Sequence, residues 1–238
     1  AVVLAAFISL MCAGLWAQLV EGSAVLSRPF GFYGGICGIA IGGLVAPVVG
    51  TSPWLVLAAW SVAAPWVQAV GRIRCLVQGC CHGAPAPAWL GIRHHHSRSR
   101  VVRLTDFAGA PLHPTPLYSI LWNALTALAV ARLWTLHAAV SLIAGVYLIL
   151  NGLGRFVEEA YRGEPQTPII ARLRLYQWLA IATVILGALC TALGPRTPAP
   201  DAVPSSHADA AALLFALVAG LALGVDFPQS ERRFSRLA

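Results

Sequence analysis

The chain has 238 residues, of which 58% are hydrophobic and 11% charged, and its mean hydropathy is +0.73. Such values lie outside the range of soluble globular domains and indicate an integral membrane protein. The formal net charge is +7, and all sixteen basic residues are arginine. A basic membrane protein is expected to contact anionic lipid headgroups, so we predict a membrane partner and no nucleic acid.

Apolar stretches with about the length of a membrane-spanning helix recur along the whole chain. They lie at about residues 1–20, 34–50, 54–70, 117–135, 138–157, 174–194 and 208–225. We therefore predict an all-α polytopic membrane helix bundle with about seven transmembrane spans. The second stretch, GGICGIAIGGLVAPVVG, is rich in small residues, which predicts close packing between neighbouring helices.

The composition divides the chain into two parts. Residues 1–194 form the predicted membrane domain, and residues 195–238 are expected to be a proline-rich linker with an additional C-terminal span. Inside the membrane domain, residues 71–116 are long and polar, with six arginines and five of the seven histidines. Because function concentrates in such excursions between short turns, we predict that this polar head loop carries the site.

A second polar segment follows the fifth apolar run in LILNGLGRFVEEAYRGEP. Arg155, Glu159 and Arg162 are spaced four and three apart, which places them on one helix face as cation, anion and cation. Arg72 follows the third apolar run on the same side of the membrane, so Arg72 and Arg155 are expected to converge on one anion. Arginine suits phosphate because its planar fork holds two oxygens. The alternative is a solvated helix end with ion pairs worth about 0.3–0.5 kcal/mol each.

Two further groups of residues are candidates for chemistry. In PLHPTPLYS, His113 stands just before a span and is either a base or a water-bound helix-start residue, whereas Tyr118 has the position of an interfacial anchor. Three other cysteines lie in apolar runs and are treated as small hydrophobes, which leaves the cysteines of GRIRCLVQGCCHG, residues 71–83. Arginines and a histidine surround these cysteines and favour thiolates, so Cys75 and Cys80 are candidate nucleophiles.

The same cysteines have two other interpretations. A bridge from Cys75 to Cys80 or Cys81 is compatible with an oxidising compartment. The spacing C-x4-C-C-H is unlike a usual zinc knuckle, and adjacent cysteines seldom both reach one ion, so we predict no metal site and no cofactor.

Five fragments resemble the bacterial prolipoprotein diacylglyceryl transferase family and occur along the chain in the family's order. Residues 71–83 resemble its signature G-R-x-G-N-F-x-N-G-E-x-x-G, HPTPLYS resembles H-P-S-Q-L-Y-E, and NGLGRFVEEAYR resembles Y-G-x-x-R-F-x-x-E-F-x-R. FYGGICG is similar to H-G-G-x-x-G, and Gln177 fits the glutamine that opens the family's last helix. The chain departs from these patterns at five positions. In the signature, Cys75 and Gln78 replace the two asparagines and Cys80 replaces the glutamate. Elsewhere, Tyr33 replaces a histidine and Asn151 replaces a tyrosine.

The resemblance implies transfer of the diacylglyceryl group of phosphatidylglycerol to a cysteine sulfur in a lipoprotein signal peptide, with release of glycerol phosphate. Under this hypothesis Arg72 and Arg155 clamp the phosphate, Glu159 fixes Arg155 or Arg162, and His82 or His113 is the base. The implied substrate-binding residues are Tyr33, Gly34, Gly35, Gln78, Gly83, Tyr118, Asn151 and Arg162. We expect a monomer.

Two alternatives stay open. One is a phospholipid-processing transferase with another acceptor or with an intermediate linked to Cys75 or Cys80. The other is a membrane protein that binds lipid or metal without catalysis.

The orientation has two conflicting indications. The positive-inside rule places the arginine-rich loops in the cytoplasm. The resemblance places them in the periplasm, and we adopt it, which predicts a multi-pass protein of the bacterial inner membrane with a periplasmic site. No basic leader precedes the first apolar run, so no cleavable signal peptide is expected. The family has an additional helix ahead of residues 1–20, which leads us to expect an incomplete or diverged N-terminus.

Overall fold

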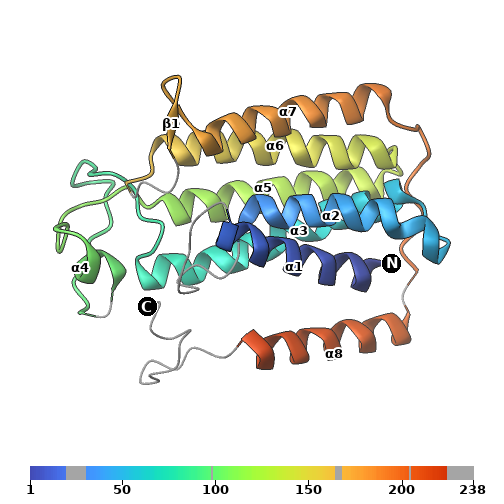
Figure 1. The fold of residues 1–238 in the computed structure, drawn as a ribbon, viewed down its shortest axis with the longest axis horizontal. Coiled ribbons are helices and arrows are strands. Elements are labelled where there is room, and N and C mark those ends of the chain that lie inside the picture. The colour runs from blue at the N-terminus through green and yellow to red at the C-terminus, as the bar shows by residue number, and fades with distance from the viewer. Residues whose placement is uncertain (20–30, 98, 164–167, 204, 224–238) are drawn as a thin grey trace.

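The computed structural model describes residues 1–19, 31–97, 99–163, 168–203 and 205–223 as a set of long helices (Figure 1). The elements are α1 (Val2–Leu19), α2 (Phe32–Val45), the 3-10 helix η1 (Ala46–Val49), α3 (Pro53–Gln78), α4 (Arg100–Leu104), α5 (Thr115–Thr135), α6 (Val140–Ala160), β1 (Ile169–Ile170), β2 (Leu173–Arg174), α7 (Leu175–Leu193) and α8 (Ser206–Leu223). In the described residues, β1 and β2 form a short antiparallel hairpin that the sequence did not predict.

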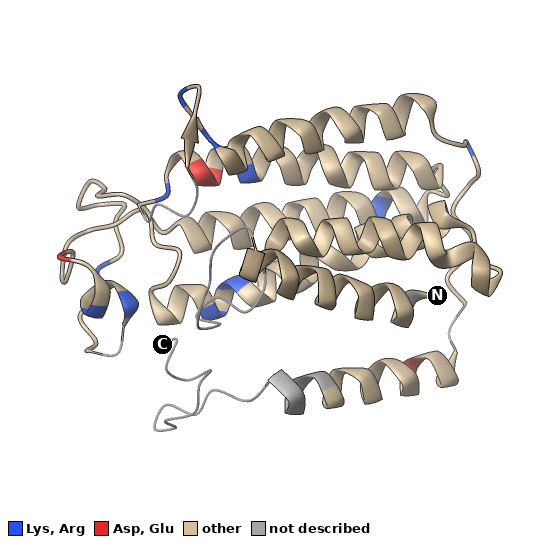
Figure 2. Ribbon diagram, viewed as in Figure 1, with Lys and Arg blue, Asp and Glu red and all other residues tan. Residues whose placement is uncertain are grey.

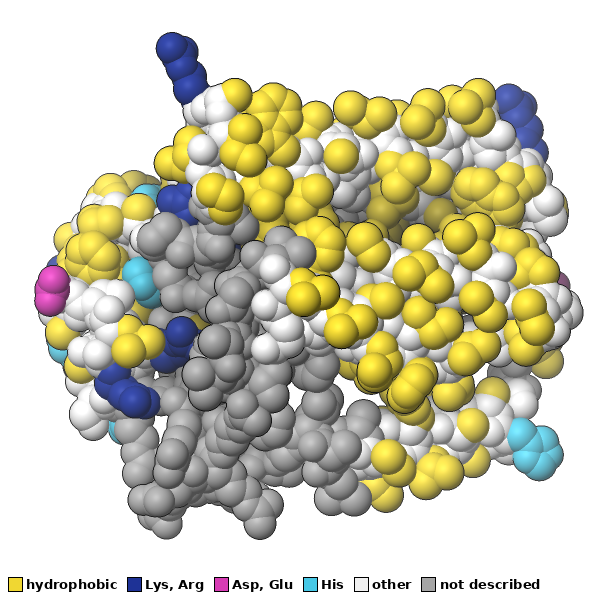
Figure 3. All heavy atoms as spheres, viewed as in Figure 1, with side chains coloured by type: hydrophobic (Ala, Val, Ile, Leu, Met, Phe, Trp, Pro, Cys, Tyr) yellow, Lys and Arg dark blue, Asp and Glu magenta, His cyan; other side chains and the backbone are white. Residues whose placement is uncertain are grey.

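The prediction of an all-α membrane bundle is confirmed. Among the described residues, five helices are long and apolar enough to span a membrane: Phe32–Val49, α3, α5, α6 and α7. The apolar stretches in α1 and α8, Val3–Leu19 and Ser206–Val218, are shorter. Hydrophobic side chains cover the visible flank of the helices, as expected for a surface that faces lipid (Figure 3).

Helix α3 is longer than its apolar run. The sequence predicted a span at 54–70 and a loop from residue 71, but the helix continues to Gln78 and ends at Gly79. Gly79 has φ +67°, and a Cβ added there would lie 2.3 Å from the hydroxyl of Ser99, so a glycine suits this helix end. The first half of the signature is therefore about two helical turns, from which Arg72, Cys75 and Gln78 project.

Glycines bring α1 and α2 into close contact. Gly34, Gly38 and Gly42 recur every four residues on α2, and a Cβ added at each would lie 2.4–2.6 Å from an α1 atom. Small residues at this spacing let two helix backbones approach each other in a membrane. Gly34, which we predicted to bind substrate, instead lies against Trp16 and Cys12 of α1.

The charged residues gather mainly at one end of the bundle, near α4 and the β1–β2 hairpin (Figure 2). At this end the segment from Gly79 to Pro114 folds back on itself, with isolated bridges between Pro85 and Leu112 and between Ile92 and Leu112. A further bridge joins Gly83 to Arg162 just beyond α6. These contacts place the loop over the ends of α3 and α6 and position the candidate site.

Candidate active site

Three arginines converge on the carboxylate of Glu158, near the end of α6. Glu158 Oε1 accepts hydrogen bonds from Arg72 Nη2 at 2.6 Å and from Arg162 Nη2 at 3.1 Å, and Oε2 accepts one from Arg155 Nη1 at 3.0 Å. The Glu158 side chain is 4% exposed. Arg72 and Arg155 therefore do lie together, as predicted, although a buried carboxylate that we did not select holds them.

A second carboxylate, Glu159, lies beside this cluster and is also buried. Glu159 Oε2 lies 3.6 Å from Arg162 Nε, and Oε1 lies 3.7 Å from Arg174 Nη1. The predicted contact of Glu159 with Arg162 is present, whereas Arg155 pairs with Glu158 instead. The group of four arginines and two glutamates has two positive charges in excess.

Burial of these charges is tolerated because each is paired with an opposite charge, and the Glu158 carboxylate is also hydrogen-bonded. Arg155 also stacks on aromatic rings, with Cζ 5.0 Å from the centre of Phe32 and 5.9 Å from that of Tyr176. Burial disfavours the charge of Arg162, but Cys81, Glu158 and Glu159 together raise its pKa above the ordinary value. Arg162 therefore stays cationic.

A cavity of about 560 Å³ opens beside the arginines. Its cationic end is formed by Arg72, Arg74, Arg100, Arg155 and Arg162, and its apolar lining includes Ala13, Ile36, Ile39, Trp60, Ala64 and Val67. Gly35 and Gln78, two of the predicted substrate-binding residues, also line it. Such a cavity suits a molecule with an anionic group and a long apolar part, because each part meets its own kind of surface.

A smaller cavity of about 170 Å³ adjoins the first and shares Gln68, Ser119 and Arg155 with it. Tyr118 and Asn151, both predicted to bind substrate, line this smaller cavity. Asn151 Nδ2 donates to Gln68 Oε1 at 3.0 Å, and Gln68 Nε2 donates to Tyr147 Oη at 2.7 Å. Ser119 Oγ accepts from Arg72 Nε at 3.2 Å, so the polar residues between the two cavities are connected to the arginine cluster.

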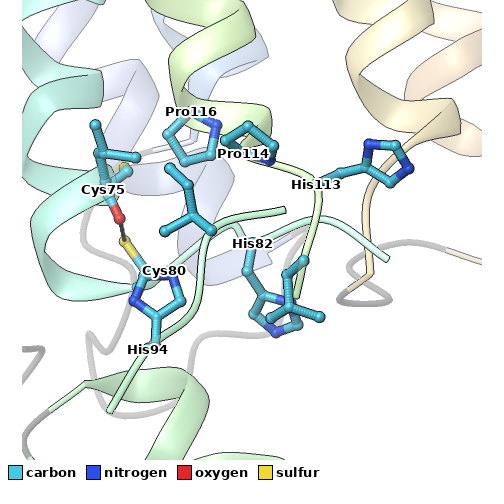
Figure 4. A pocket seen from close by; sticks show the side chains of 11 residues that line it. Cys75, Cys80, His82, His94, His113, Pro114 and Pro116 are labelled. Atoms are coloured by element: carbon cyan, nitrogen blue, oxygen red, sulfur yellow. Dashed lines mark hydrogen bonds between the residues drawn. The ribbon is translucent and has the colours of Figure 1, made fainter. Parts of the chain in front are cut away.

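The two candidate bases lie away from the large cavity. His82 and His113 line a void of about 10 Å³ together with Cys75, Cys80 and His94 (Figure 4). His113 Nδ1 lies 3.1 Å from Tyr118 Oη, and His82 Nδ1 lies 3.0 Å from the carbonyl oxygen of Gly83. Burial lowers the pKa of His94. Neither His82 nor His113 is among the residues that line the arginine cavity.

Two other predicted substrate-binding residues, Tyr33 and Gly83, pack against residues next to the site and are not among those that line the large cavity. Tyr33 is buried, and its hydroxyl donates to the carbonyl oxygen of Tyr176 at 3.0 Å. Gly83 packs directly on His113, where an added Cβ would lie 2.4 Å from the His113 Cβ, and its N–H donates to the His113 carbonyl at 3.0 Å. Tyr33 thus packs beneath the Arg155 stack, and Gly83 lets two loop segments touch.

The three signature cysteines meet at one point. The sulfur atoms of Cys75, Cys80 and Cys81 all lie within 4.8 Å of one another, and the three residues line the large cavity. Figure 4 shows the Cys80 sulfur directed at the carbonyl oxygen of Cys75, 3.9 Å away. Hydrogen bonds from the Cys75 and Cys80 thiols, and then the charges of Arg162 and Arg72, outweigh burial and lower the pKa of Cys81 well below its usual range. Hydrogen bonds with Cys75 and Cys81, together with burial, raise the pKa of Cys80, so the thiolate expected at Cys80 lies at Cys81 instead.

Sequence reasoning missed Glu158 and Arg174 as site residues. Glu158 follows Arg155 by three positions and precedes Arg162 by four, so the helical spacing contained a usable signal. Gln68 and Ser119 were also missed, although a polar residue inside an apolar span is itself an indication of function.

Several known proteins are similar to this chain in sequence. A family model described as prolipoprotein diacylglyceryl transferase matches residues 3–193. A phosphatidylglycerol–prolipoprotein diacylglyceryl transferase of Clostridium tetani is 32% identical over 169 residues, which cover 68% of this chain and 63% of that protein. A second such protein, from Clostridium perfringens, is 29% identical and covers 73% of this chain and 67% of its own length.

A third relative with the same name, from Symbiobacterium thermophilum, is 31% identical over 57% of this chain and 49% of its own length. The chain thus spans about half to two thirds of the length of these relatives. The family model covers every residue of the arginine cluster and of the cavity. The chain therefore belongs to the prolipoprotein diacylglyceryl transferase family.

Proposed function

We propose that this chain transfers the diacylglyceryl group of phosphatidylglycerol to the cysteine thiol of a lipoprotein signal peptide. The observation that carries the proposal is the arginine cluster at the polar end of a 560 Å³ cavity with an apolar lining. Phosphatidylglycerol has one phosphate and two acyl chains, so it complements both parts of this cavity. The names of the relatives support the same substrate and acceptor.

The chemical task of the cluster is to receive a departing phosphate. The acceptor thiol loses its proton to solvent, and its sulfur attacks the glycerol carbon that bears the phosphate ester. The carbon–oxygen bond breaks, and glycerol phosphate leaves with the electron pair. Arg155 lines the cavity, and its buried Nε has no hydrogen-bond partner in the described part of the chain, so we assign the Arg155 guanidinium as a donor to the phosphate. Preorganised donors of this kind stabilise developing charge in a site that excludes water.

Glu158 acts as a positioning residue in this account. Its carboxylate holds Arg72 of α3 against Arg155 of α6, and without it the like charges would repel each other. The two excess positive charges of the cluster then remain for the lipid phosphate.

Transfer is measured directly in lipid nanodiscs that contain the purified chain. A signal-peptide substrate with a single cysteine should gain the mass of a diacylglyceryl group when the discs contain phosphatidylglycerol. The same peptide should stay unmodified in discs of phosphatidylethanolamine alone, because the headgroup then carries a compensating amine. Unmodified peptide in both kinds of disc would rule the proposal out.

A second candidate is a transferase that first forms an intermediate on its own cysteine. It is favoured by one observation, namely that Cys75 and Cys80 line the same cavity as Arg72 and Arg155. Intact-mass analysis after incubation with phosphatidylglycerol and no peptide distinguishes the two, since only the second candidate adds a diacylglyceryl group to the chain.

The proposed site faces the periplasm of the bacterial inner membrane. Ser97 is exposed in the head segment, and Leu136 is 56% exposed at the other end of α5. We predict that a membrane-impermeant thiol reagent labels Ser97→Cys in spheroplasts above the level of the parent chain. Leu136→Cys, the matched control, should be labelled only after lysis, and the reverse pattern would place the site in the cytoplasm.

A further inference from the structure

The sulfur atoms of Cys75, Cys80 and Cys81 form a cluster that the proposed lipid chemistry does not use. Cys75 lies on the last turn of α3, and the chain then turns at Gly79, with φ +67°, and at Cys81, with φ +57°. A positive φ is unusual for a cysteine, and here it brings two adjacent cysteines back to a third. The sequence spoke against a metal for two reasons, the spacing C-x4-C-C-H and the adjacency of Cys80 and Cys81. In the structure the sulfurs of these adjacent cysteines do lie close enough to approach one ion together, so the second reason does not hold.

Three convergent thiols have a specific chemical meaning. A nucleophile needs one sulfur and a disulfide needs two, whereas a thiophilic metal ion uses all three. Around zinc, with Zn–S bonds of about 2.3 Å, tetrahedral sulfurs stand roughly 3.8 Å apart. The spacing found here, within 4.8 Å, requires only a small inward movement of flexible side chains. Within the ranges that the structure describes, this is the one group of three or more candidate ligands that meets that spacing.

The number of ligands favours a reactive rather than a structural ion. Structural zinc sites are closed by four protein ligands, while catalytic sites use three and keep the fourth position open. Here the three cysteines line the large cavity, so an open position would face the same space as Arg72, Arg155 and Arg162. Three thiolates around a divalent cation carry one net negative charge, which the neighbouring arginines compensate.

We propose that Cys75, Cys80 and Cys81 bind a zinc ion whose open position takes the acceptor cysteine as a thiolate. This inference rests on the proposed function and supplies what that function lacks, since His82 and His113 do not line the cavity. On binding, the acceptor thiol releases its proton to solvent, because a coordinating thiol is deprotonated. The metal-bound sulfur then forms the bond to the glycerol carbon while glycerol phosphate leaves toward the arginines. The step is a substitution and needs no oxidant or reductant.

The substituted positions agree with this assignment. Cys75 and Cys80 stand where the resembling signature has an asparagine and a glutamate. Two polar groups of that pattern are thus replaced by soft metal ligands, Cys81 stands at an unspecified position between them and Gly83, and Arg72, Arg155 and Arg162 are kept.

Metal binding is tested without lipid or peptide. The full chain is purified in detergent, reduced, loaded with Zn²⁺, passed over a chelating resin and analysed for zinc. A parallel sample takes Co²⁺, whose thiolate charge-transfer absorption reports sulfur ligation. We expect stoichiometric metal in the unaltered chain and at least a tenfold loss in Cys75→Ser, Cys80→Ser and Cys81→Ser. Cys190→Ser on α7 is the matched control and should keep the metal.

Three results would overturn the metal site. They are the absence of retained metal, equal retention in all four serine variants, and a disulfide that survives reduction between two of the three cysteines. Cys80→Asp separates the loss of a ligand from the loss of the fold. Aspartate still offers a ligand atom, so this variant should recover part of the zinc that Cys80→Ser loses.

A second measurement separates this inference from the proposed function. Transfer by the unaltered chain should fall at least tenfold on zinc removal and return on zinc addition, whereas Cys75→Asn/Cys80→Glu should lose its response to zinc. Transfer that ignores zinc removal would overturn the inference and leave the proposed function intact. Zinc bound to the three cysteines of a chain that transfers no lipid would contradict the proposed function and the role given to the metal, but not the site.

Discussion

Arg155→Ala should lower the rate of diacylglyceryl transfer by about two to three orders of magnitude. One donor to a developing oxyanion is worth about 3–4 kcal/mol of transition-state stabilisation, and Arg155 lines the cavity that we assign to the lipid. The rate is measured with the signal-peptide substrate in phosphatidylglycerol nanodiscs. Because the interaction is made mainly in the transition state, kcat should fall more than KM rises.

Arg132→Ala is the control for this variant. Arg132 is exposed on α5 and contacts Thr135 at 3.4 Å, away from the cavity, so its removal should leave the rate within about twofold. Arg155→Lys keeps the charge but loses the fork that holds two oxygens, and it should recover only part of the activity. An Arg155→Ala chain as active as the Arg132→Ala chain would contradict the role of the cluster.

Glu158→Gln should have the largest effect on stability. It leaves three arginines together without the carboxylate that accepts their hydrogen bonds at 2.6–3.1 Å. Breaking a buried ion pair by removal of one partner costs about 3–5 kcal/mol, because the remaining charge is buried without compensation. The unfolding midpoint of the purified chain in detergent should therefore drop by several degrees, as measured by the change in intrinsic tryptophan fluorescence.

Glu159→Gln provides the comparison for that result. Its carboxylate is equally buried, but the distances to Arg162 and Arg174 are 3.6 and 3.7 Å. Ion pairs at these distances without hydrogen bonds contribute less, so Glu159→Gln should destabilise the chain less than Glu158→Gln. Equal midpoints for the two variants would show that Glu158 is not the centre of the network.

Hydropathy was sufficient to predict the main helices because a membrane imposes a minimum apolar length. It failed at the end of α3, where the apolar run stops near residue 70 but the helix continues to Gln78. Helicity there depends on backbone hydrogen bonds and on the turn at Gly79, and neither requires apolar side chains. The β1–β2 hairpin has two residues per strand, which is too short to produce an alternating pattern.

The arginines were predictable and their partner was not. Helical spacing placed Arg155 and Arg162 on one face, but both Glu158 and Glu159 are spaced to reach Arg162. Which carboxylate becomes the centre depends on where α3 brings Arg72, and that is a tertiary contact between residues 86 positions apart. The cysteine cluster has a similar origin, since the positive φ of Cys81 cannot be read from its side chain.

The central claim is that the arginine cluster serves lipid transfer to a thiol. It is tested most directly in cells depleted of their own diacylglyceryl transferase, with the mass of a resident lipoprotein as the readout. The account predicts that this chain restores growth and the diacylglyceryl modification, and that Arg72→Ala, expressed to the same level, restores neither. Unmodified lipoprotein in cells that express the unaltered chain, or equal modification by the Arg72→Ala chain, would contradict it.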